Sequence, residues 1–170
     1  MNQIIHSILN DDKKYHFKFF SNNDSPNSHL KEVTQNLTNN SGLYLVFIEK
    51  NIFDKSEMHL NFYINNKSYC LIYFGKAGGI SKSGKVITQG LKGRINNVIS
   101  DGVRGLKDVK RAIYWNQILN ELNYESLDVF CIEHINPSEI EDKLYDFLDR
   151  SNLKYPILNK KRGRTKKMKK

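Results

Sequence analysis

The pattern of hydrophobic and polar positions predicts short helices and strands from the beginning of the chain. An amphipathic helix is expected at Asn2–Leu9 and a short strand at Tyr15–Phe20. The polar stretch Ser21–Ser28 is typical of a loop, and a short helix is expected around His29–Leu37. A turn at Asn39–Gly42 then precedes the first long apolar stretch.

Three strands are predicted next, because branched and aromatic residues dominate Leu43–Glu49, His59–Asn65 and Ser68–Gly75. The last two are separated by so few residues that a tight hairpin should join them. Strands connected in this way favour an antiparallel sheet.

The second half of the chain alternates between loops and regular elements. The glycine-rich stretch Lys76–Gly93 predicts a long loop, and a helix should begin near Leu91–Arg94 and run to Ser100. A second helix is expected at Lys107–Leu122 and a fourth strand at Leu127–Ile135. Pro137 should open a last helix, which runs to about Arg150 and carries its apolar residues on one face.

These elements predict an α+β fold with a small, mostly antiparallel sheet of three to four strands flanked by helices. A chain of 170 residues fits one domain. We expect residues 1–40 to be an N-terminal extension packed on the core and residues 41–159 to form the main domain. Residues 160–170 should be a disordered basic tail.

The sequence contains no apolar run of 18 residues and no secretory signal pattern. A cytoplasmic protein without a membrane partner is therefore expected. Its two cysteines, Cys70 and Cys131, lie in apolar strand-like stretches without metal-ligand spacing, so both should be reduced core residues.

The net charge of +9 is concentrated in two places. Residues 160–170 contain eight Lys/Arg, and removing them leaves 19 basic and 18 acidic residues. The stretch from Lys76 to Arg111 contains nine basic and two acidic residues. This distribution predicts a face that binds a polyanion, although a solvated lysine-rich loop and tail would give the same composition. The candidate DNA contacts are Lys82, Lys85, Lys92, Arg104, Lys107, Lys110 and Arg111.

Five short motifs follow one another on the predicted elements. Gly42–Tyr44 opens a strand, Tyr73–Lys76 ends another, Leu91–Arg94 begins a helix, Glu141 lies early in the last helix, and Pro156–Asn159 closes the body. This order resembles the GIY-YIG nuclease superfamily over about residues 41 to 160, and most closely its small restriction endonucleases.

The resemblance implies a role for each motif residue. Tyr44 would be the general base, with Tyr73 as its hydrogen-bonding neighbour or as an alternative base. Arg94 would clamp the phosphate, and Lys76 would lie near the attacking water. Glu141 would hold one Mg²⁺, which Mn²⁺ can replace. Gly42, Gly75 and Asn159 would be supportive.

Phosphodiester hydrolysis needs these residue types. A carboxylate can hold a divalent cation that acts as a Lewis acid, and an arginine presents a donor fork to the phosphate oxygens. A tyrosine can accept the proton of the attacking water if nearby cations lower its pKa from about 10.

Some assignments remain open. Glu141 could instead belong to a capping box with Ser138, and Glu139, which forms a second such box with Asn136, competes for the metal. Many members of the superfamily carry His or Tyr four residues after the arginine, where this chain has Val98. His134 and Tyr114 are candidates for that missing contact. The spacings between the motifs are also long, which implies insertions that help to grip DNA.

A phosphate-loop spacing occurs at Gly79–Lys85, but Val86 follows where Mg²⁺ ligation needs Ser or Thr. The amides and lysines of this loop could contact DNA phosphates instead.

The expected function is a metal-dependent endonuclease that acts on double-stranded DNA. A sequence-specific type II restriction enzyme fits best, and a homodimer is among the expected assemblies. The alternatives are a repair or homing-type GIY-YIG nuclease and a non-catalytic basic nucleic-acid-binding protein.

Deleting residues 160–170 should weaken binding to every DNA sequence similarly, because a flexible cationic tail contacts phosphates and not base edges. Each lost phosphate contact should reduce the slope of log K against log salt by about 0.9. Binding isotherms across salt concentrations measure this slope. A truncated protein that loses its sequence preference would contradict the prediction.

Overall fold

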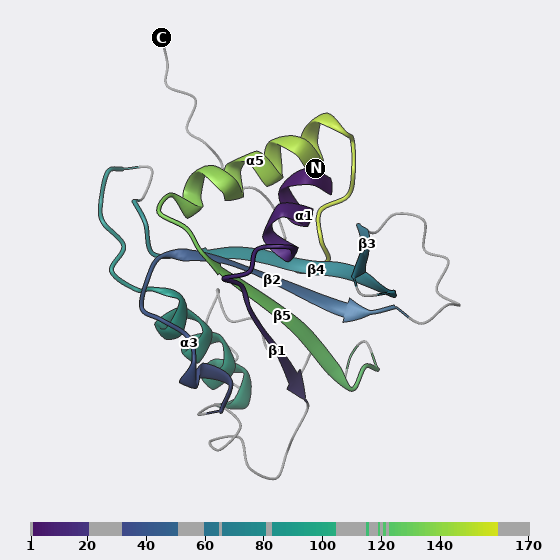
Figure 1. The fold of residues 1–170 in the computed structure, drawn as a ribbon, viewed down its shortest axis with the longest axis horizontal. Coiled ribbons are helices and arrows are strands. Elements are labelled where there is room, and N and C mark those ends of the chain that lie inside the picture. The colour runs from purple at the N-terminus through teal and green to yellow at the C-terminus, as the bar shows by residue number, and fades with distance from the viewer. Residues whose placement is uncertain are drawn as a thin grey trace.

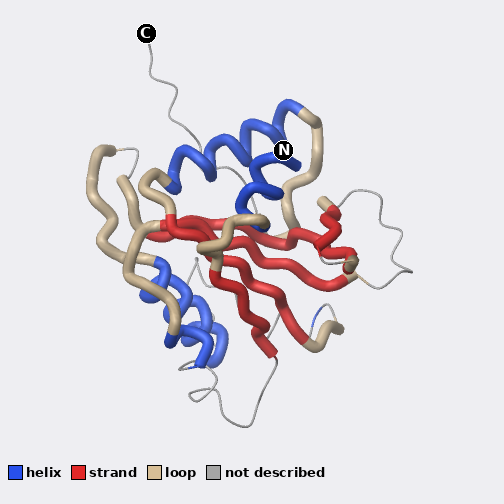
Figure 2. The backbone as a smooth tube through the Cα atoms, viewed as in Figure 1, coloured by secondary structure: helices blue, strands red, loops and turns tan. Residues whose placement is uncertain are grey.

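One antiparallel sheet organises the computed structural model of the chain (Figures 1 and 2). The structure describes residues 2–20, 32–50, 60–64, 66–80, 83–104, 115, 119, 121 and 123–159. The sheet has the strand order β1-β5-β2-β4-β3. The strands are β1 (Tyr15–Phe20), β2 (Gly42–Glu49), β3 (Asn61–Ile64), β4 (Lys67–Ala77) and β5 (Ser126–Glu133).

The two central strands, β2 and β5, are nearly continuous apolar runs because both faces of the sheet are covered at this point. On one face, α1 (Asn2–Leu9) and α5 (Pro137–Arg150) pack against Leu43, Leu45 and Phe130. On the other face, α3 (Leu91–Arg104) packs against Tyr44 and Val46. We call these the α5 face and the α3 face of the sheet.

The α+β prediction holds, but the predicted sheet of three to four strands was too small. The sheet has five strands, because β1 pairs with β5 along all six of its residues. Strand β5 therefore has partners on both sides, and the first 20 residues contribute both a strand and the helix α1 to the body of the protein.

Two predicted boundaries near the motifs were also wrong. Strand β4 continues to Ala77, so Lys76 lies in a strand and not in the loop. Helix α3 begins at Leu91 and continues to Arg104, which is longer than the predicted end at Ser100 and places Gly93 inside a helix. A loop at 78–90 joins these two elements.

Several predicted segments fall wholly or partly outside the described residues. Residues 21–28 and 160–170 lie outside them, as does most of Lys107–Leu122, of which Trp115 and Leu119 are helical and buried. Within the predicted helix His29–Leu37, residues 32–35 are helical.

A β-bulge in β4 changes which side chains face α3. Val46 pairs with Tyr73 and Phe47 pairs with Leu71, so Ile72 is an extra residue without a partner in β2. Ile72 and Tyr73 consequently both point to the α3 face, where they pack with Val46. Beyond the bulge the alternation is shifted by one residue.

The structure bears on two further expectations. Among the described residues no helix is long and apolar enough to cross a membrane. Cys70 and Cys131 are buried free thiols, and burial raises the pKa of Cys131.

Strand β1 is held to the sheet by a buried carboxylate. Asp128 of β5 is fully buried and accepts hydrogen bonds from His16 Nε2 at 2.8 Å and Lys18 Nζ at 3.0 Å, both from β1. The His16 ring also stacks on Phe130, with 4.2 Å between ring centroids. Burial by itself raises the pKa of Asp128, but the hydrogen bonds from His16 and Lys18 outweigh it, so the pKa is lowered.

Asp128→Asn should destabilise the protein at neutral pH by about 1–3 kcal/mol, because charge-assisted bonds to both β1 residues are weakened. Since the folded-state pKa lies below that of the unfolded chain, this stability is present above about pH 4 and is lost as the pH falls through the folded-state value. Urea unfolding between pH 7 and pH 3 measures the effect. The exposed Asp12→Asn is the matched control. Equal pH dependence in the wild type and the Asp128 variant would contradict the prediction.

Candidate active site

The two motif tyrosines lie side by side on neighbouring strands. Tyr44 of β2 is 3% exposed, and its hydroxyl donates to the Tyr73 hydroxyl of β4 with 3.4 Å between the oxygens. Their ring centroids are 5.6 Å apart. The motif order predicted this adjacency, and the Ile72 bulge is what brings Tyr73 to the face of Tyr44.

Gly75 leaves room for the tyrosine pair. It lies opposite Tyr44 in the β2–β4 register, and a Cβ atom there would be 2.8 Å from both hydroxyl oxygens. The space around Gly42, at the start of β2, is also too small for a side chain, because a Cβ atom would lie 2.2 Å from the Ile132 carbonyl oxygen. Both motif glycines therefore permit close approach at the site.

The pKa values of the tyrosines differ from the expectation. Burial raises the pKa of Tyr44 well above its ordinary value, and Tyr73 adds to this effect. Burial also raises the pKa of Tyr73, while the hydrogen bond from Tyr44 and the charge of Arg94 oppose it. The cation near the pair thus does not lower either pKa below about 10 in the free protein.

Arg94 of α3 is close enough to both tyrosines that its charge favours their ionised forms. Its Nε is buried and has no hydrogen-bond partner among the described residues. An unpaired buried donor costs free energy, and an anionic ligand could satisfy it.

The position of Arg94 depends on how α3 begins. The amides of Leu91 and Lys92 donate to the carbonyl oxygens of Asn40 and Thr38, which cap the first turn. Gly90 allows this junction, because a Cβ would lie 1.7 Å from the Asn39 carbonyl oxygen.

Glu133 at the end of β5 holds the same turn. Its carboxylate accepts hydrogen bonds from the side chains of Thr38 and Asn40 and from Tyr15 of β1. The bonds from Thr38 and Asn40 lower the pKa of Glu133. Sequence reasoning missed Glu133, because nothing in its local pattern marks it as a support for a helix that begins 42 positions earlier in the chain.

On the α5 face, Lys76 and Glu141 form an ion pair. Lys76 Nζ lies 3.0 Å from Glu141 Oε2 and donates to Ser138 Oγ at 3.0 Å. The Ser138 hydroxyl in turn donates to the Ile80 carbonyl oxygen. The Glu141 charge raises the pKa of Tyr73, which links this ion pair to the tyrosines. The candidate set therefore consists of the Tyr44–Tyr73 pair with Arg94 on one face of the sheet and the Lys76–Glu141 pair on the other, at the same end of β4.

The start of α5 separates the two candidate glutamates. The N-cap is Asn136, whose side chain bonds Glu139. Glu139 also pairs with Lys143, which lowers its pKa, on an exposed part of the helix. Ser138 and Glu141 do not form a capping box, because Ser138 lies after the N-cap and Glu141 turns to Lys76.

In the described part of the chain, no hydrogen bond of His134 supplies the auxiliary contact that was expected near Val98. His134 Nδ1 accepts the Asn136 amide at the turn before α5. Tyr114 lies outside the described residues, and so does the side chain of Val98.

Asn159 fastens the outer edge of β4. Its side chain accepts from the Phe74 amide at 3.0 Å and donates to the Phe74 carbonyl at 2.9 Å. The neighbouring Leu158 amide donates to the carbonyl of Ile72, the extra residue of the bulge. The closing segment therefore satisfies the backbone groups on both sides of Tyr73.

The expected DNA contacts are only partly described. Lys85 is exposed in the 78–90 loop, and Lys92 is partly buried on α3. Lys82, Lys107, Lys110 and Arg111 lie outside the described residues, as does the side chain of Arg104.

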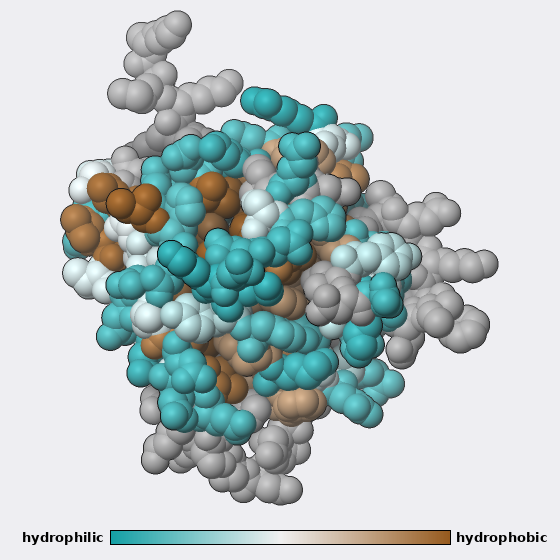
Figure 3. All heavy atoms as spheres, viewed as in Figure 1, coloured by the Kyte–Doolittle hydropathy of each residue, from teal (hydrophilic) through white to brown (hydrophobic). Residues whose placement is uncertain are grey.

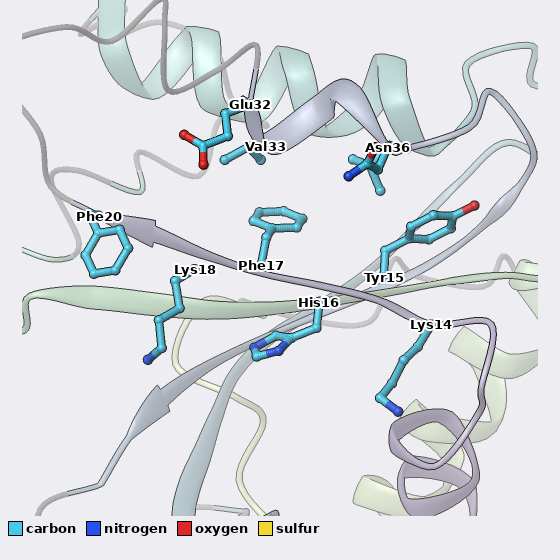
Figure 4. Close-up of a pocket in the computed structure, with 10 residues that line it drawn as sticks. Lys14, Tyr15, His16, Phe17, Lys18, Phe20, Glu32, Val33 and Asn36 are labelled. Carbon is cyan, nitrogen blue, oxygen red and sulfur yellow. The ribbon is translucent and has the colours of Figure 1, made fainter.

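A pocket of about 600 Å³ lies away from this set, at the β1 edge (Figure 4). It is lined by β1 and by residues 32–37, with Tyr15 and Phe17 pointing toward Val33 and Asn36. None of the candidate catalytic residues lines it.

Comparison of the chain with protein-family models, with curated proteins and with solved structures finds no match. The assignment of roles consequently rests on the motif residues and on their geometry.

Glu141 is the residue of the set that could hold a divalent cation. No group of three or more His, Cys, Asp and Glu side chains that could hold a metal ion occurs in the described part of the chain. Mg²⁺, however, commonly uses one or two carboxylates together with waters and substrate phosphates. The partly exposed carboxylate of Glu141, at the end of the sheet where the tyrosine pair lies, fits that mode of binding.

Asn159→Ala should destabilise the protein by about 2–4 kcal/mol, because it leaves two buried backbone groups of Phe74 unsatisfied. Hydrogen exchange of the Phe74 amide should accelerate in parallel. Urea unfolding and exchange measured by NMR check both effects. Ile157→Ala, an exposed site in the same segment, is the matched control. An unchanged exchange rate at Phe74 would show that Asn159 does not hold this edge.

Proposed function

We propose that this protein is a metal-dependent endonuclease that hydrolyses phosphodiester bonds in double-stranded DNA. The observation that carries the proposal is that five residues, chosen from the order of their motifs, lie at one end of the sheet. The Tyr44–Tyr73 pair lies with Arg94 on one face, and the Lys76–Glu141 pair lies on the other. These residues come from four separate stretches of the chain, and this common location supports the proposal.

The geometry favours Tyr73 over Tyr44 as the group that accepts the proton of the attacking water. Tyr44 is almost completely buried, and it donates its own proton toward Tyr73. A phenolate at Tyr73 would be stabilised by that hydrogen bond and by Arg94. Tyr44 would then be a positioning residue, which reverses the roles that the resemblance implied first.

Arg94 would bind the non-bridging oxygens of the scissile phosphate. The attacking oxygen forms a bond to phosphorus as the bond to the 3′ oxygen breaks, and negative charge accumulates on the remaining oxygens. A guanidinium whose Nε is desolvated and unpaired is already oriented for such a charge.

Glu141 would hold the cation, and Lys76 would keep the carboxylate in place beside Tyr73. When bound, a divalent cation such as Mg²⁺ supplies positive charge near the leaving 3′ oxygen. Lys76 is itself fixed by Ser138, so its ammonium group remains at the edge of the site when DNA is absent.

Within this class we propose sequence-specific cleavage of the restriction type. The chain between the motif residues includes the connection from β2 to β3 and the connection from β4 to α3, and these would supply contacts to bases. Discrete fragments from a plasmid of known sequence would support this narrower proposal, and random nicking would contradict it.

Purified protein should nick or linearise plasmid DNA in the presence of Mg²⁺, and EDTA should abolish the reaction. Glu141→Gln and Arg94→Ala should each lower the cleavage rate by at least about 100-fold, since each removes a group that stabilises charge in the transition state. Their melting temperatures should stay close to that of the wild type.

Glu139→Gln is the matched control, because it alters an exposed glutamate on the same helix. It should cleave at nearly the wild-type rate. Loss of activity in Glu139→Gln alone would transfer the metal to Glu139. Tight DNA binding by the wild type without any metal-dependent cleavage would favour a non-catalytic binding protein.

A further inference from the structure

The loop at 78–90 presents two apolar side chains together. Ile80 and Val86 form an isolated antiparallel bridge, which places their side chains next to each other. They are 59% and 65% exposed, although both are branched aliphatic residues. Figure 3 shows hydrophobic side chains gathered at the edge of the molecule where this loop lies.

The loop is fixed against the start of α5. The Ser138 hydroxyl donates to the Ile80 carbonyl oxygen at 3.0 Å, and Gly79 packs on the Pro137 ring. In the turn just before α5, Ile135 is 93% exposed. Lys76 donates to the same Ser138 hydroxyl. Ser138 therefore contacts both the backbone of Ile80 and the Lys76 side chain of the Lys76–Glu141 ion pair.

The candidate catalytic groups are recessed. Tyr44 is 3% exposed, and the side chains of Lys76 and Glu141 are 21% and 20% exposed. The phosphates of a straight, stiff duplex lie on its outer surface, and bending or unstacking a duplex costs free energy. A scissile phosphate that must reach these recessed groups would be helped by a local deformation of the DNA.

We propose that Ile80 and Val86 form a wedge that enters a base step beside the scissile phosphate and opens the duplex toward Arg94 and Glu141. This inference rests on the proposed endonuclease function. Proteins that kink DNA use one or two apolar side chains in this way, and the deformation allows more protein surface to contact the backbone. The exposed Lys85, adjacent to Val86, would contact a flanking phosphate.

A duplex suits this surface better than a second copy of the chain does. A stable protein interface buries about 800 Å² on each partner, far more than two aliphatic side chains and Ile135 offer. The patch also adjoins the Lys76–Glu141 pair, where a protein partner would cover the groups that must meet the phosphate.

The test begins with the cleavage site mapped by plasmid digestion. A duplex oligonucleotide containing that site carries 2-aminopurine at one position at a time and is bound to the full-length Glu141→Gln protein. Fluorescence should rise at one step next to the scissile phosphate, because 2-aminopurine brightens when it is unstacked. Adding Ile80→Ser and Val86→Ser to that protein should abolish the rise.

In the otherwise wild-type chain, Ile80→Ser/Val86→Ser should reduce cleavage of the matched duplex by at least about tenfold, since unstacking costs a few kcal/mol. A mismatch placed at the opened step should restore most of the rate. Tyr63→Ser, which alters a side chain that is 76% exposed on β3, is the matched control and should cleave normally. Melting temperatures show whether each variant folds. If the double variant does not fold, Ile80→Ser and Val86→Ser are tested singly.

Three results would overturn the wedge while leaving the nuclease intact. The first is normal cleavage with an unchanged fluorescence rise in the double variant, and the second is a loss of rate that no mismatch restores. The third is a wild-type protein that is dimeric in solution and becomes monomeric on substitution. A wild-type protein that cleaves no DNA would overturn the proposed function and the wedge together.

Discussion

The extra residue of β4, Ile72, sets the direction of the side chains that follow it on that strand. Without the bulge, strict alternation would turn Tyr73 to the α5 face, away from Tyr44. With the bulge, Tyr73 and Gly75 lie on the α3 face. The Leu158 amide bonds the Ile72 carbonyl, and the Asn159 side chain bonds the amide and carbonyl of Phe74, so the backbone on both sides of Tyr73 is held. Leu158 and Asn159 thus support the position of Tyr73, although the strand that carries it ends about 80 residues earlier in the chain.

Two helices bring charge to this end of the sheet from opposite faces. Helix α3 supplies Arg94 to the tyrosine face, and its first turn is capped by a segment that Glu133 holds. Helix α5 supplies Glu141 to the other face, where Lys76 and Ser138 tie it to β4 and to the 78–90 loop. Strand β4 passes between them, and Tyr73 responds to the charges of both. The site is therefore an arrangement around the end of one strand and not the lining of a cavity.

Sequence reasoning was reliable where one physical signal dominated. The helices at α1 and α5 were predicted at their observed bounds, because apolar spacing marks both and Pro137 marks the start of the second. The tyrosine pair was predicted from the order of the motifs. The sequence could not show the Ile72 bulge, whose carbonyl accepts a bond from the distant Leu158. It predicted the strand Tyr15–Phe20 at its observed bounds but not the pairing of that strand with β5, which is long-range. It also could not show how far burial raises the tyrosine pKa values, since that depends on what covers them. The choice between Glu139 and Glu141 likewise needed the direction in which each side chain leaves α5.

Under the proposed function, the hydrogen-bonded register of β2 and β4 would separate catalysis from recognition of the substrate. Tyr44, Tyr73 and Lys76 are positioned by strand pairing, whereas the connection from β2 to β3 and the connection from β4 to α3 lie outside the paired residues of β2 and β4. Residues can therefore be added to or removed from either connection during evolution while the reactive side chains keep their spacing. In a nuclease, such changes would alter which sequences are bound, while the sheet would remain a constant frame.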